Sequence, residues 1–229
     1  MANGDLLLLD DFYFRYRDSD GLQLNFSYDQ TGLLKNNDKI ISLEIDKYSN
    51  VCEWIKNNES SSFKDLRSLH ISGPLSENNL ECLKKIAEIK PDPGIYIEYM
   101  DYVFIKKLFS MFDPSWLVYE DIEEEVVLGE LFSDLNNLEL LQIGGSNKLD
   151  FLYNIPGLNS LIIMGLDTEV NKNFTFGKIK NLKSLSIIES DMEDLSYIGE
   201  IPGLRSLNLN RCGSLKDISQ VKNFHGLKV

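Results

Sequence analysis

The chain has 229 residues, 43% of them hydrophobic, and its 36 acidic and 23 basic side chains give a net charge of −13. This length and apolar content suffice for one well-cored domain or one elongated array of repeats. The charge disfavours binding to nucleic-acid phosphates or anionic membranes and favours a cationic partner, although acidity also serves solubility alone.

The start of the chain carries no signal of export. It lacks a basic segment, and its apolar run, residues 6–9, is four leucines long, too short for a signal-peptide core or a membrane span. The three cysteines, Cys52, Cys82 and Cys212, are scattered and odd in number. This usage predicts reduced thiols and a cytoplasmic protein.

Residues 12–28 alternate apolar and polar positions on both sides of the turn-forming segment Asp18-Ser19-Asp20-Gly21. Alternation around such a segment predicts a β-hairpin. We expect residues 1–35 to form a cap with this hairpin, which covers one end of the domain.

Residues 36–137 contain short apolar runs that predict strands, separated by segments with helical spacing. The predicted strands are Ile40–Ile45, Leu66–Ile71, Ile95–Ile97 and, on weaker evidence, Trp116–Tyr119. Four helices are predicted to alternate with them. The first is Val51–Lys56, and the second begins with a capping box of Asn78 and Glu81 and ends before Pro91. The third begins near Asp101, with Val103, Ile105, Leu108 and Phe109 as its apolar residues, and the fourth is a short acidic helix at Glu123–Leu131.

One six-residue phrase returns four times in residues 138–209. It reads LELLQI from Leu138, LNSLII from Leu158, LKSLSI from Leu182 and LRSLNL from Leu204, with apolar residues at its first, fourth and sixth places. The fourth-place leucines, at positions 141, 161, 185 and 207, are 20, 24 and 22 residues apart. The earlier strands fit the same numbering, with fourth places at 43, 69, 95 and 117. Self-similarity at such a period predicts a repeat architecture.

This phrase resembles L-x-x-L-x-L of the leucine-rich repeat family, over most of the chain. Cys212, eight residues after Leu204, stands where the family carries Asn or Cys, which implies a buried structural role. The resemblance implies a single α/β domain over residues 1–229, a curved solenoid (horseshoe) with about nine parallel strands on its concave face. Helices in the longer repeats of residues 36–137, and turns or 3₁₀ segments in the regular repeats of residues 138–229, would lie on the convex face.

The last six residues, Phe224–Val229, look like a ninth copy that ends after its strand. Leu215, Ile218 and Val221 are expected to supply the apolar residues of the return segment before it. We expect Val229 either to pair adequately or to leave an edge open to a neighbouring molecule.

The third, fifth and seventh places of each copy are expected to face the concave side, because side chains alternate along a strand. These places carry acids toward the N-terminal half, including Glu44 and Asp46, and apolar residues in the middle. The predicted partner-binding residues are Tyr96, Glu98, Trp116, Val118, Glu120, Leu140, Ile162, Met164 and Ile188. A register shift by one residue in the irregular region 90–125 would instead bury Trp116 and Val118.

The sequence gives little support for catalysis or for metal binding. The two histidines, His70 and His225, are far apart, and no nucleophile elbow, phosphate-binding loop, H-E-x-x-H or C-x-x-C occurs. The acidic run 120–125 lacks the ligand spacing of a calcium loop and is interpreted as a solvated helix N-terminus. We therefore expect a non-enzymatic protein without cofactor or metal.

These observations predict a protein-protein interaction module that binds a partner protein, basic in charge, on its concave face. One form of this is a stoichiometric inhibitor, such as an immunity protein against a basic toxin or effector. An adaptor or scaffold subunit, or a structural protein that self-assembles through its C-terminal strand, remains an alternative. The chain is expected to be a monomer or to self-associate weakly through that edge, with no affinity for nucleic acid or membranes.

Overall fold

The computed structural model describes residues 5–8, 14–17, 33–36, 39–98, 102–120, 128–132, 134–144 and 148–227. They form an α/β fold around one sheet of nine strands in the order β11-β10-β9-β8-β7-β6-β5-β4-β3. The strand of this sheet that comes first along the chain is β3 (Leu33–Asn36), which lies antiparallel to β4 (Lys39–Asp46). The seven that follow β4, each parallel to the one before, are β5 (Ser68–Ser72), β6 (Gly94–Glu98), β7 (Trp116–Glu120), β8 (Leu140–Gly144), β9 (Ser160–Leu166), β10 (Ser184–Ser190) and β11 (Ser206–Asn210).

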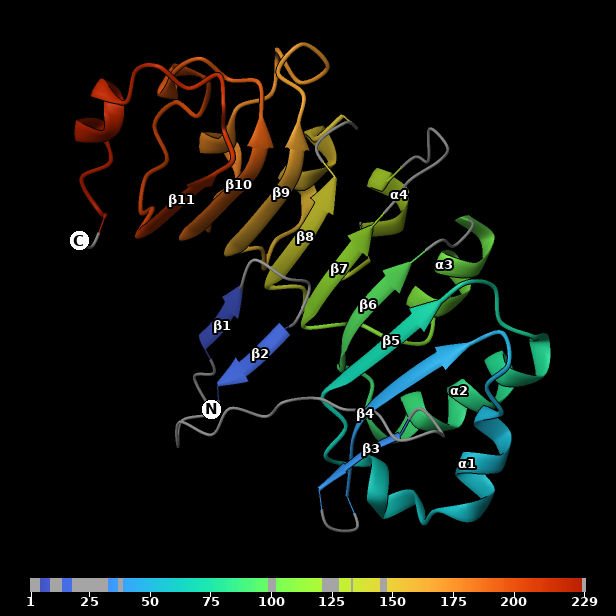
Figure 1. Cartoon of the computed structure of the whole chain (residues 1–229). Coiled ribbons are helices and arrows are strands. Elements are labelled where there is room, and N and C mark those ends of the chain that lie inside the picture. The colour runs from blue at the N-terminus through green and yellow to red at the C-terminus, as the bar shows by residue number, and fades with distance from the viewer. Residues whose placement is uncertain are drawn as a thin grey trace.

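Each parallel strand is thus bonded to the strand of the next repeat, an arrangement compatible with a solenoid. The register follows the repeat phrase: Leu161 lies opposite Leu185, and Leu185 opposite Leu207. The weakest predicted copy obeys it too, since Leu117 lies opposite Leu141. Figure 1 shows the sheet following a curve, with the helices along its outer side.

The core lies between the sheet and the segments that return from one strand to the next. Fourth-place and sixth-place side chains enter it and are completely shielded in the central repeats, for example Leu161, Ile163, Leu185 and Ile187 at 0% exposure. Burial of this kind stabilises each repeat only when its neighbours are present, because one repeat cannot close its own core.

The return segments change from α-helix to 3₁₀-helix along the chain, as the shortening of the repeats predicted. The α-helices are α1 (Val51–Asn57), α2 (Glu77–Ile89), α3 (Tyr102–Phe109) and α4 (Leu128–Phe132). The 3₁₀-helices are η1 (Ser60–Phe63), η2 (Asp150–Asn154), η3 (Phe176–Lys178), η4 (Leu195–Tyr197) and η5 (Ser219–Asn223). None of the helices in the described ranges is long and apolar enough to cross a membrane.

Two details of the predicted helices were wrong. The capping residue of α2 is Ser76, whose hydroxyl oxygen accepts from the Asn79 amide, so the helix begins before the predicted box at Asn78. In α3 the buried set includes Phe104 in place of Val103, which is 63% exposed. Of the predicted acidic helix 123–131, residues 123–127 lie outside the described residues, and α4 extends to Phe132.

The N-terminal hairpin differs from the predicted one. Strand β2 (Phe14–Arg17) pairs antiparallel with the preceding segment β1 (Asp5–Leu8), while the predicted turn and second run lie outside the described residues. The edge of the large sheet is occupied by β3, which pairs its backbone with β4. Most of residues 1–35 lie outside the described residues, so the predicted end cap stays a prediction.

The C-terminal end of the sheet is β11, and the predicted ninth strand does not form in its described part. Residues 225–226 form a turn, residues 224 and 227 belong to no strand, and residues 228–229 lie outside the described residues. Ile218 and Val221, in the return segment after β11, are 59% and 43% exposed. Leu207 and Leu209 are only half-buried, unlike their equivalents in earlier repeats.

A residue with left-handed backbone recurs at one place of the repeat, inside β9 and β10 near their ends and directly after β5 and β11. It lies four residues after the fourth-place residue, at Gly73, Gly165, Glu189 and Arg211, with φ of 78°, 67°, 61° and 53°. This backbone region suits glycine and is costly for side chains with a Cβ. The chain therefore repeats a backbone conformation even where the sequence no longer supplies glycine.

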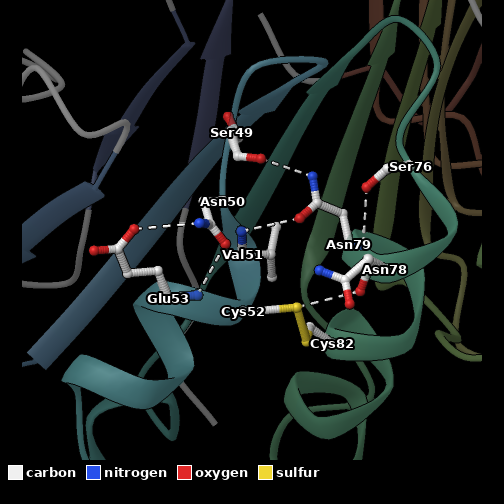
Figure 2. Close-up of a disulfide and its surroundings, with 9 residues drawn as sticks. All are labelled: Ser49, Asn50, Val51, Cys52, Glu53, Ser76, Asn78, Asn79 and Cys82. Atoms are coloured by element: carbon white, nitrogen blue, oxygen red, sulfur yellow. Dashed lines mark hydrogen bonds between the residues drawn. A yellow bond between two sulfur atoms is a disulfide. The ribbon is translucent and has the colours of Figure 1, made fainter.

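A disulfide joins Cys52 of α1 to Cys82 of α2 (Figure 2). The expectation of three reduced thiols was therefore wrong for these two, which are 30 residues apart in sequence yet adjacent in neighbouring repeats. Only stacking of the return helices brings them within bonding distance, which their spacing along the chain does not reveal. Cys212 remains a free thiol.

Beside the disulfide, buried Asn79 ties its repeat to the preceding one (Figure 2). Its carbonyl oxygen accepts from the Val51 amide at 3.1 Å, and its amide nitrogen donates to the Ser49 carbonyl at 2.7 Å. Asn171 plays a related role in a later repeat, since its side-chain oxygen accepts from the Leu149 amide at 2.9 Å. Such bonds satisfy backbone groups that would otherwise be buried without partners.

Candidate functional site

The sheet has a second face, opposite the core, which we call the inner face. It consists of the third-place, fifth-place and seventh-place residues of β4 to β11. Val118 and Ile162, both fifth-place residues, are 0% and 3% exposed, yet neither belongs to the contiguous core that contains their neighbours Leu117 and Ile163. The predicted alternation of faces is therefore present, and the alternative register that places Trp116 and Val118 in the core was wrong.

The degree of exposure on this face was predicted incorrectly for two residues. Val118 and Ile162 were expected to be open to a partner and are instead buried. Strands in a sheet lie about 4.8 Å apart, so adjacent strands shield a mid-strand side chain on both flanks but not at its tip. The remaining apolar residues of the predicted site that flank them, Leu140, Met164 and Ile188, are half-buried.

Trp116 lies along the sheet beside Gly94 of the neighbouring strand. A Cβ atom at Gly94 would come within 1.7 Å of the Trp116 indole, so the absence of a side chain at Gly94 is what admits the ring. The indole is half-buried in consequence. The sequence carried this signal, because the third-place residues before Trp116 are Ser42, Ser68 and Gly94, all small.

The centre of the inner face also holds polar side chains that were not predicted as site residues. Gln142 and Ser186 are both 6% exposed. The Gln142 amide contacts the Met164 sulfur at 3.2 Å, and Asn208 donates to the Ser186 hydroxyl at 3.1 Å. These contacts run from strand to strand and hold the face in one arrangement.

The N-terminal half of the inner face is acidic and aromatic. The rings of His70 and Tyr96 stack with centroids 5.3 Å apart, and the Tyr96 hydroxyl donates to Glu98 at 2.7 Å. Glu44 is exposed, while Glu98 is half-buried. Glu120 ends β7 opposite Glu98 in the register, and its side chain lies outside the described residues.

Asp46, at the end of β4, keeps a negative charge on the N-terminal half of the inner face. Burial acts to raise the pKa of its carboxyl group, but the hydroxyl of Ser49 and the amide of Tyr48, at 2.8 and 2.9 Å, outweigh it and leave that pKa below its usual value. An ionised carboxylate at this edge attracts a cationic group.

His70 is unsuited to general base catalysis near neutral pH. Burial lowers the pKa of its imidazole to about 4, against the opposing effect of the Glu98 charge. His225 is exposed near the other end of the sheet. Within the described ranges no group of His, Cys, Asp and Glu side chains is arranged to hold a metal ion.

Acidification is expected to destabilise the protein through His70. The folded-state pKa of about 4 lies below the ordinary value of 6.5, so the unfolded chain binds more protons between those two values, and stability falls as pH falls through this window. The loss should approach about 3 kcal/mol near pH 4. Urea unfolding of the wild type and of His70→Gln at pH 7.5, 5.5 and 4.5 measures it, because carboxylate contributions are common to both. Equal pH dependence of the two proteins would contradict this assignment.

Cys212 lies two residues after the end of β11. Its sulfur lies 3.5 Å from the Asn210 carbonyl oxygen and 3.8 Å from that of Ile187, as a thiol donating to the backbone of its own and the preceding repeat. Burial raises the pKa of this thiol. The predicted structural role agrees with these contacts, but the side chain is half-buried instead of buried, because β11 is the final strand of the sheet.

No protein-family model matches the chain, and no curated protein matches it. The geometry of the inner face is therefore what points to a function.

Proposed function

We propose that this chain is a leucine-rich repeat protein without catalytic activity, which binds a partner protein on its inner face. The four regular copies of the phrase support the family, and so does the register in which their leucines stand opposite one another along the sheet. The earlier strands β4, β5 and β6 keep the same register, with Leu43 opposite Leu69 and Leu69 opposite Ile95.

One observation carries the binding proposal: half-buried apolar side chains cluster on the sheet face opposite the core. Met164 and Ile188 stand opposite each other near the ends of β9 and β10, and Ile162 shares their face, whereas Leu140 lies at the start of β8, opposite Ser160. Clustered apolar side chains outside the core are typical of a contact surface. A sheet that is already rigid loses little conformational entropy on binding, so these contacts convert well into affinity.

The charge of the face favours a cationic partner. Glu44, Asp46 and Glu98 lie at its N-terminal half, in a chain with a net charge of −13. Complementary charge accelerates encounter and excludes acidic competitors. The function that unites these features is stoichiometric inhibition of a basic protein, as an immunity protein blocks a toxin or effector.

A second candidate is an adaptor or self-assembling role at the C-terminal edge. The observation that favours it is the exposure of Ile218 and Val221, together with the half-buried Leu207 and Leu209 of β11. An edge strand with apolar neighbours is a template for pairing with another chain.

Affinity capture from native lysate with mass spectrometry tests both candidates. We expect the wild type to retain one basic protein near a one-to-one ratio, and Met164→Ser/Ile188→Ser to lose it. The matched control is Val103→Ser/Val170→Ser, which removes exposed apolar side chains that lie outside the sheet, 63% and 42% accessible, and should retain the partner. Retention by the inner-face variant would contradict the proposal. Recovery of the bait alone, with a size in solution that grows with concentration, would favour self-assembly.

A further inference from the structure

We propose that the β1–β2 hairpin packs over the centre of the inner face and shields its apolar side chains until a partner displaces it. The packing itself follows from intrachain observations. Only its consequence, competition with a partner, rests on the proposed function.

In the fifth-place row of the inner face, burial is confined to the strands at the centre of the sheet. The fifth-place residues of β7 to β10, namely Val118, Gln142, Ile162 and Ser186, are between 0% and 6% exposed. In the same row, Glu44 of β4 and Asn208 of β11 are exposed, and His70 and Tyr96 are intermediate. Flanking strands shield the sides of a side chain but leave its tip open. A cover above β7 to β10 is therefore required.

The helices do not supply this cover. The contiguous core that they help to form contains Leu117 and Tyr119 of β7 but excludes Val118 between them. The same holds at β9, where Leu161 and Ile163 belong to the core and Ile162 does not. Figure 1 places the helices along the outer side of the curved sheet and the β1–β2 hairpin on the inner side.

The hairpin has the pattern of an element that needs such a surface. Leu6 pairs with Tyr16 and Leu8 with Phe14, so these four residues share one face of the two-stranded sheet. The other face holds Asp5, Leu7, Arg15 and Arg17. An isolated two-stranded hairpin is at best marginally stable in water, and packing an apolar face against a larger sheet stabilises it.

The hairpin also carries positive charge. Arg15 and Arg17 belong to the face opposite Leu8 and Phe14, so their attraction to Glu44, Asp46 and Glu98 acts only through the long-range field. The hairpin thus combines apolar and cationic residues, which is the chemistry proposed for the partner. A partner of that chemistry competes with the hairpin for the same face.

Cysteine labelling at Ile162 tests the packing without any partner. The background is Cys212→Ser/Ile162→Cys, in which the single free thiol is the reporter because Cys52 and Cys82 are joined. Maleimide labelling is compared among this protein, the same protein with Leu8→Asp, and the matched control with Leu7→Asp. The two aspartates differ only in the face of the hairpin that they occupy.

We expect Leu8→Asp to accelerate labelling by at least about tenfold, because the cover opens locally, and Leu7→Asp to change it by less than about twofold. An unchanged rate in Leu8→Asp, or equal acceleration by both, would overturn the proposal. A reporter moved to the core, Ile163→Cys, must stay unreactive in Leu8→Asp. If it also becomes reactive, the variant has opened the whole domain and Ile162 is not specifically covered, which would likewise overturn the proposal. The labelling experiment contains no partner protein, so failure of the affinity capture would count against the proposed function and not against the packing of the hairpin.

Discussion

Replacing Ile187 by alanine is expected to lower the free energy of unfolding by about 4 kcal/mol, and the same change at Ile188 by about 1 kcal/mol or less. The two residues are adjacent in β10 and chemically identical. Ile187 is 0% exposed within the contiguous core, whereas Ile188 is half-buried on the inner face. The difference arises because truncation at Ile187 leaves a cavity that close-packed neighbours cannot fill, while water reaches the space left at Ile188.

Guanidinium unfolding of the three proteins, wild type and the two variants, measures this difference directly. An equal m-value is needed, so that the midpoints report stability alone. Equal losses at the two positions would show that the two faces of β10 are equally buried and would remove the basis for an inner-face binding site. A larger loss at Ile188 would reverse the assignment of the faces.

The Cys52–Cys82 disulfide is expected to contribute about 3 to 4 kcal/mol, the entropy that a link across a 30-residue separation removes from the unfolded chain. Cys52→Ser/Cys82→Ser should therefore lose that stability in non-reducing buffer. Addition of a reductant should bring the wild type down to the level of the variant. Unfolding in urea with and without dithiothreitol measures both effects, and Cys212→Ser is the matched control that should behave as the wild type does.

Thiol counting gives an independent reading of the same link. The denatured, unreduced wild type should expose one reactive thiol, that of Cys212, and three after reduction. Three thiols before reduction, together with equal stability of the wild type and the double variant, would contradict the disulfide. Such a result would restore the expectation of reduced cysteines that the sequence suggested.

The repeat phrase by itself determined the order and register of the parallel strands. Apolar residues at the first, fourth and sixth places recur every 20 to 26 residues, and only one alignment of neighbouring strands buries all of them. Even the weakly matching Trp116–Tyr119 was placed correctly, because Leu117 and Tyr119 must share a face when side chains alternate. Repeat length likewise predicted α-helices in the early return segments and 3₁₀-helices in the later ones.

Only the tertiary structure decided what happens at the two ends and across the stacked repeats. The ends differ because β3 pairs with β4 on one side, whereas no described strand follows β11 on the other. The Cys52–Cys82 link and the bonds of Asn79 join residues about 30 apart, and a pattern read along the chain does not contain the distance between neighbouring rungs. The burial of Val118 and Ile162 is likewise decided by the tertiary structure. Alternation assigns their face, but the exposure of that face depends on what else in the chain packs against it.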